Sequence, residues 1–108
     1  MINYQDTCPI CNQLVLLQQF ARGLWGCPIS INNNDEHFHY TINNIYGEDK
    51  LVKHITIYPY TITLDEHQML SVQDDLDWRF FYSEQLCSEE RFRDFYKSDT
   101  FKNLSLIK

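Results

Sequence analysis

The sequence is poor in residues that interrupt regular structure, since its 108 residues include only three glycines and three prolines. No glycine- or serine-rich linker and no internal repeat divides the chain, so we expect a single domain over residues 1–108. The chain also lacks a run of eighteen apolar residues, so no transmembrane helix is expected. The first six residues have neither the basic region nor the apolar stretch of a signal peptide, which predicts a cytoplasmic protein.

Basic residues are also scarce: nine lysines and arginines stand against fifteen aspartates and glutamates, for a net charge of −6. This balance disfavours general binding to nucleic acid or to an anionic membrane. Residues 65–94, here called the acidic segment, carry nine acidic and three basic groups. The net charges of the two flanking parts cancel, because residues 1–64 carry −2 and residues 95–108 carry +2. The acidic segment is either a solvated face or a surface that meets a basic protein partner.

The motifs of common enzyme classes are absent. The sequence has no glycine-rich phosphate loop, no G-x-S-x-G turn and no H-E-x-x-H helix. Asp35 and Glu36 are the acidic residues beside the first histidines, and a solvated loop at 31–36 accounts for both. We therefore expect no catalytic residues and a protein that is not an enzyme.

Alternation of apolar and polar residues predicts an antiparallel meander in the centre of the chain. Phe38, Tyr40 and Ile42 alternate with polar side chains, which is the period of a half-buried strand. Pro59 cannot donate to a ladder, so it marks a bulge or an edge. Further strands are expected at 51–57, 60–64, 69–72 and 76–82, with turns at 46–50 and 65–68. Residues 12–20 form either a strand or a helical turn.

The C-terminal part of the sequence has helical signals. Ser88 is a suitable N-cap, and two glutamates follow it in the first turn, where they complement the helix dipole. Phe92, Phe95 and Tyr96 have the i, i+3, i+4 spacing of an apolar helix face. A second short helix is expected at 101–107. The aromatic side chains of both helices should pack in the core.

Three of the four cysteines predict a metal site. Cys8 and Cys11 form a C-x2-C turn that can direct two sulfurs at one ion, and Cys27 follows after fifteen residues. Zinc takes four ligands in a tetrahedron at about 2.0–2.3 Å. Asn12 tolerates the left-handed conformation that often follows such a turn. A thiolate-rich site is expected to be structural and to contribute folding free energy to a chain this small.

The fourth ligand is less obvious, because Ser30 stands where a second C-x2-C turn would have its last cysteine. A histidine from the first strand could reach back over the preceding loop. His39 is the first choice and His37 the second, and His54 on the neighbouring strand is the third. Cys87 is expected to be a buried free thiol.

The turn at 8–11, the Cys27-Pro28 step and the His39-Tyr40 step before a meander resemble small zinc-ribbon proteins. Many of these are encoded by phages or bacteria and have no assigned function. The resemblance covers residues 8–64. It implies a zinc-ribbon-like N-terminal part with Cys8, Cys11, Cys27 and His39 as ligands of a structural Zn²⁺. The resemblance does not extend to residues 65–108.

Three other interpretations of the cysteines stay open. The C-P-I-C turn also resembles the active-site Cys-Pro-x-Cys of glutaredoxins, which implies a thiol oxidoreductase using Cys8. Against it, only seven residues with little strand character precede the turn, and the later Val-Pro and Gly-Gly elements of that family are missing. Two disulfides would need an oxidising compartment. In the third interpretation, the cysteines bind nothing and are ordinary small buried residues.

These observations together predict an α+β protein with a small zinc-ribbon-like knuckle, an antiparallel β-meander and a C-terminal helix. The zinc-ribbon-like part covers 1–45, the meander 46–82 and the helical end 83–108. Trp25 and Trp78 are expected to anchor the core, and exposure of either one on a face would instead mark an interface.

The function expected is protein binding by a small acidic protein with structural zinc, such as a viral factor that modulates a host complex in the host cytoplasm. One alternative is a zinc ribbon that binds nucleic acid, with Arg22, Lys50, Lys53 and the basic tail forming a local patch. A variant of the first idea is an acidic surface that mimics nucleic acid. The last alternative is the thiol oxidoreductase.

Overall fold

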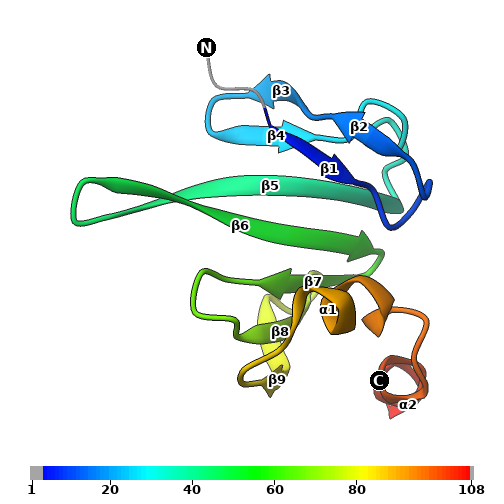
Figure 1. Cartoon of the computed structure of the whole chain (residues 1–108). Coiled ribbons are helices and arrows are strands. Elements are labelled where there is room, and N and C mark those ends of the chain that lie inside the picture. The colour runs from blue at the N-terminus through cyan, green and yellow to red at the C-terminus, as the bar shows by residue number, and fades with distance from the viewer. Residues whose placement is uncertain (1–3, 108) are drawn as a thin grey trace.

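The computed structural model describes residues 4–107, which form two antiparallel sheets and two short helices (Figure 1). The elements are β1 (Gln5–Thr7), β2 (Leu14–Leu16), β3 (Gln18–Ala21), β4 (Leu24–Gly26), β5 (Glu36–Ile45), β6 (Glu48–Ile57), β7 (Tyr60–Leu64), β8 (Leu70–Asp74), β9 (Arg79–Glu84), α1 (Glu89–Phe95) and α2 (Asp99–Ile107). The hairpin β1–β2 is a sheet of its own, and β3 to β9 form one seven-stranded sheet in sequence order. This architecture agrees with the expected α+β class.

The longest hairpin joins β5 to β6, which pair along all ten residues of each strand. Its turn has two residues, Tyr46 with φ of 51° and Gly47 with φ of 83°. Positive φ at both central positions is the geometry of a type I′ turn, which matches the twist of the strands. The turn expected at 46–50 is therefore shorter, because the ladder continues through its last three residues. One sheet also crosses the expected boundary between 1–45 and 46–82.

The other strand predictions hold with shifted boundaries. The strand at 60–64 is confirmed as β7, but β9 begins at Arg79 because residues 75–78 form a turn. Pro59 lies in the turn between β6 and β7, where its missing N–H interrupts no ladder, so the expectation of a bulge or an edge was wrong. Residues 14–20 form β2 and the start of β3, rather than a helical turn.

The core lies on one face of the sheet, because apolar and polar residues alternate along its strands. Phe38, Ile55, Ile62 and Val72 stand opposite one another on four neighbouring strands, and each is 0% exposed. Burial of one such side chain contributes about 1.5–3 kcal/mol. The buried rings of α1 and α2 join the same cluster, namely Phe92, Phe95 and Phe101.

The start of α1 is capped as the sequence predicts. The hydroxyl of Ser88 accepts a hydrogen bond of 3.0 Å from the N–H of Arg91, and Glu89 and Glu90 lie in the first turn. A cap of this kind satisfies a main-chain donor that the helix itself leaves unpaired. The helix is thereby fixed directly after β9, with Phe92 turned into the core.

The two tryptophans have different environments. Trp25 packs against the core, and its ring meets that of Tyr4 edge-on at 5.2 Å. Trp78 is 78% exposed and has a φ of 57° in the turn before β9, so its expected place in the core was wrong. The left-handed backbone at Trp78 ends the alternation that would have turned its ring inward.

Neither α1 nor α2 is both long and apolar enough to cross a membrane, and no other helix occurs in residues 4–107.

Candidate metal centre

Three cysteines meet at the N-terminal end of the fold, where the Sγ atoms of Cys8, Cys11 and Cys27 lie within 4.8 Å of one another. We call these residues the thiol cluster. Cys8 and Cys27 are 0% exposed, and Cys11 is partly buried. The 3.8 Å between Cys11 Sγ and Cys27 Sγ far exceeds a disulfide bond of about 2.0 Å, and all four cysteines are free. The cluster therefore has the composition and closeness of a metal-binding site.

Two similar turns carry these sulfurs. In the first, the N–H of Asn12 donates to the carbonyl of Cys8 at 2.7 Å, and in the second the N–H of Ile31 donates to that of Cys27 at 2.8 Å. Asn12 has a φ of 61°, the left-handed conformation that the sequence predicted. The first turn contributes two sulfurs, whereas the second ends at Ser30, whose Oγ is 3.6 Å from Cys8 Sγ.

The cluster joins two parts of the fold that share no strand pairing. The first turn connects β1 to β2, and the second follows β4 in the seven-stranded sheet. The second turn is held against β5, because the N–H of Cys27 donates to the carbonyl of Phe38 at 3.2 Å. A metal ion at the cluster would therefore cross-link the hairpin to the main sheet.

The thiols differ in how readily they ionise. Burial raises the pKa of Cys11 to about 11. Burial opposes ionisation of Cys27 too, but hydrogen bonds from the N–H and hydroxyl of Ser30 and the N–H of Ile29 outweigh it and lower the pKa of that thiol. Metal binding requires thiolates, so an ion entering the cluster would release protons.

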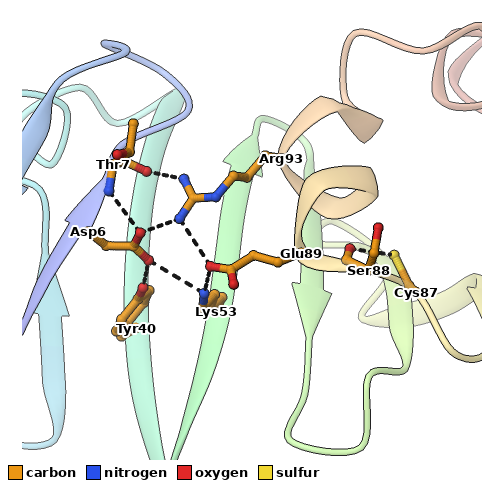
Figure 2. Close-up of polar contacts among 8 residues, drawn as sticks. All are labelled: Asp6, Thr7, Tyr40, Lys53, Cys87, Ser88, Glu89 and Arg93. Atoms are coloured by element: carbon orange, nitrogen blue, oxygen red, sulfur yellow. Dashed lines mark hydrogen bonds and ion pairs between the residues drawn. The ribbon is translucent and has the colours of Figure 1, made fainter.

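Residues at the C-terminal end of helix α1 hold the first turn in place through polar contacts. Arg93 donates to the carbonyl of Thr7 and forms an ion pair with Asp6 (Figure 2). Tyr96, the C-cap residue of α1, donates its Oη hydroxyl to the carbonyl of Pro9 at 2.8 Å. These contacts fix the main chain on either side of Cys8. The wider network in Figure 2 adds Tyr40, Lys53 and Glu89.

The histidines do not join the cluster among residues 4–107. His37 and His39 alternate with buried Phe38, so they lie on the other face of β5. His39 stacks on His54 of β6, with ring centroids 4.7 Å apart, and lies 4.9 Å from His37. Both ring nitrogens of His54 are hydrogen-bonded, to Thr41 at 2.8 Å and Thr63 at 2.9 Å. The structure thus places the three histidine candidates in a stack of their own.

The imidazole stack is held in its neutral form. Burial, and then the charges that His54 and His37 would carry, lower the pKa of His39 to about 3. Burial, and then the charge of His37, lower the pKa of His54 to about 4. Nδ1 of His39 is buried without a hydrogen-bond partner among the described residues. Protonation of a histidine in this stack would therefore destabilise the folded state, because it would bury a charge.

Cys87 lies apart from the cluster, as expected from its position in the sequence. It is 4% exposed, and its thiol donates to the carbonyl of Ser88 at 3.3 Å. Burial raises the pKa of this thiol. These features are those of a buried free cysteine.

Ser30 lies in the site, although the sequence marked it only as the position of a missing cysteine. The sequence does contain a signal for it, because residues 8–11 read C-P-I-C and residues 27–30 read C-P-I-S. The shared Cys-Pro-Ile start predicts equivalent turns, and equivalent turns place Ser30 where the first has Cys11.

Comparisons of the chain with protein-family models, with curated proteins and with solved structures found no match.

The stack predicts a loss of stability in acid. The folded pKa values of about 3 and about 4 lie below the ordinary 6.5, so the unfolded chain binds protons first as the pH falls. Stability should therefore decrease from about pH 6.5 downward. The variant His39→Leu should lose less stability than the wild type between about pH 7 and about pH 5, as measured by urea unfolding at matched pH. An equal loss in the two proteins would contradict this assignment.

Proposed function

We propose that this chain is a small structural-zinc protein that acts as a non-enzymatic protein-binding module. The observation that carries the metal part is the thiol cluster: three free, largely buried sulfurs from two turns, all within 4.8 Å. Thiolates favour Zn²⁺ among the divalent ions that are abundant in cells. The similarity of the two turns to each other supports the proposed relation to zinc ribbons over residues 8–64.

The site suits a structural ion better than a catalytic one. A catalytic zinc keeps a position open to water and substrate. Here Cys8 and Cys27 are 0% exposed and Ser30 is 5% exposed, which leaves little room for a substrate to approach. Three thiolates on Zn²⁺ also carry a net charge of about −1, which makes bound water a weak source of nucleophile.

The protein-binding part rests on the last strand of the sheet. Strand β9 pairs with β8 and, within residues 4–107, with no other strand, so it is an edge strand of the sheet. A free edge can add a strand from a partner protein. Exposed apolar side chains surround this strand, with exposed fractions of 64%, 78%, 65% and 83% for Leu76, Trp78, Phe80 and Leu86.

A shallow groove lies along β8 and β9 and includes Phe80 in its lining. Its volume is about 670 Å³, and Met69, Phe80 and Tyr82 are among the residues that line it. Exposed apolar clusters of this kind are typical of interaction sites. The acidic segment contains all of them and has a net charge of −6, so we infer a partner with apolar and basic side chains.

The alternatives fit the geometry less well. Lys50 forms an ion pair with Glu48, and Lys53 lies between Asp6 and Glu89, so two members of the suggested basic patch are already paired. A thiol oxidoreductase needs an accessible thiolate as the attacking group, whereas Cys8 is 0% exposed. Protein binding therefore remains the better-supported proposal.

The metal is tested by the zinc content of the purified chain and of two variants. Wild type and Cys87→Ser should hold about one zinc ion per chain, because Cys87 lies outside the thiol cluster. Cys8→Ser should lose most of the metal and unfold at a lower denaturant concentration. Mass spectrometry under native conditions and a chelator titration measure both effects. A wild-type chain without tightly held metal, or equal loss in Cys87→Ser, would refute the proposal.

The binding surface is tested by comparing the proteins captured by immobilised variants. Trp78→Asn with Phe80→Thr removes apolar surface beside the free edge while keeping residues suited to a left-handed turn and to a strand. The control carries Leu14→Thr and Leu16→Thr, which are exposed apolar residues at the other end of the fold. The double change near β9 should abolish capture of a specific partner, and the control should retain it. Identical capture by both would exclude β9 as the binding surface.

A further inference from the structure

The thiol cluster supplies three ligands, and the identity of the fourth follows from Ser30. We propose that Ser30 Oγ is the fourth ligand of the metal, so that the centre is of a Cys3Ser type. This inference rests on the proposed metal site and goes beyond it in assigning a ligand, a net charge and a relative bond strength.

The distances fit one tetrahedron. A zinc ion with bonds of about 2.3 Å to sulfur places two sulfurs about 3.8 Å apart, and a bond of about 2.0 Å to oxygen places oxygen and sulfur about 3.5 Å apart. The observed distances are 3.8 Å between Cys11 Sγ and Cys27 Sγ, and 3.6 Å between Ser30 Oγ and Cys8 Sγ. These two distances match those of tetrahedral coordination, and all three sulfurs lie within 4.8 Å of one another.

Ser30 is held in this position by the main chain. Its Oγ accepts a hydrogen bond of 3.3 Å from the N–H of Phe38, and the turn that carries it is closed by the bond from Ile31 to Cys27. A hydroxyl oxygen has two lone pairs and one proton. One lone pair faces Phe38, which leaves the other for an ion. The proton can point at a neighbouring thiolate, as the contact with Cys27 already indicates.

Within residues 4–107, no other histidine, cysteine or carboxylate side chain joins the thiol cluster. The histidine candidates lie on the opposite face of β5, where His54 already uses both nitrogens. Cys87 and all carboxylates among the described residues lie outside the group of close ligand atoms. Ser30 is thus the polar side chain in contact with the cluster that is both buried and oriented toward it.

A serine hydroxyl as the fourth ligand gives the metal centre a smaller net charge than a fourth thiolate would. Zn²⁺ with three thiolates and a neutral hydroxyl has a net charge of about −1, whereas a fourth thiolate would give about −2. A smaller buried charge costs less desolvation free energy. The hydroxyl is also the weakest of the four ligands, so the three thiolates should provide most of the affinity.

The experiment uses Co²⁺ as a spectroscopic probe in the full chain, with Ser30→Ala, Ser30→Cys and the control Ser105→Ala. Ser105 donates its hydroxyl to a main-chain carbonyl in α2, far from the cluster in the chain. Affinities come from chelator competition, and the number of thiolates comes from the sulfur-to-metal charge-transfer absorption. Far-ultraviolet circular dichroism checks that each variant is folded.

Ser30→Ala should bind the metal about 10- to 100-fold more weakly, with the charge-transfer intensity of three thiolates retained. Ser30→Cys should bind more tightly and gain about one third in charge-transfer intensity, as four thiolates replace three. Ser105→Ala should match the wild type in both measurements.

The outcomes separate this inference from the proposed function. If the wild type binds no Co²⁺ or Zn²⁺ tightly, the metal site itself fails. If the wild type binds but Ser30→Ala has the same affinity and Ser30→Cys the same spectrum, Ser30 is not a ligand and the metal site stands. A weakened site in His39→Ala together with an unchanged one in Ser30→Ala would assign the fourth position to the histidine.

Discussion

The attachment of the N-terminal hairpin depends on the meeting of three sulfurs from two chain segments. Strands β1 and β2 pair only with each other among the described residues, so no backbone ladder connects them to the main sheet. The turn between them is instead placed by the thiol cluster and by the contacts of Arg93 and Tyr96. Three closely spaced thiols repel one another once ionised, and a cation at their centre would convert that repulsion into a cross-link.

Much of the sheet could be predicted from the sequence, because its signals are local. Alternation located the strands that became β5 and β7, and Ser88 marked the start of α1. The predictions that were wrong concern turns, whose backbone conformations are not specified by composition. The turn at Tyr46 and Gly47 needs only two residues because both take positive φ. Trp78 likewise leaves the core because its backbone is left-handed in the turn before β9.

The three cysteines of the candidate site could be predicted from the sequence, but the fourth ligand could not. The spacing of Cys8, Cys11 and Cys27 is a local signal, and the structure brings those three together. The choice of His39 required knowing which face of β5 meets the second turn, and this depends on the register with β4 and β6. Phe38 occupies the side toward the cluster, which sends His39 to the other side. The repeated Cys-Pro-Ile start pointed to Ser30, but a serine is rarely sought among zinc ligands.

We propose above that one metal ion is held by three thiolates and the hydroxyl of Ser30. X-ray absorption spectroscopy of the zinc-loaded wild-type protein tests it most directly, because it counts the ligands by element and measures their distances. The spectrum should show about three sulfur atoms at about 2.3 Å and one oxygen at about 2.0 Å, without the outer-shell pattern of an imidazole ring. Two sulfurs or fewer, or a clear imidazole contribution, would contradict it.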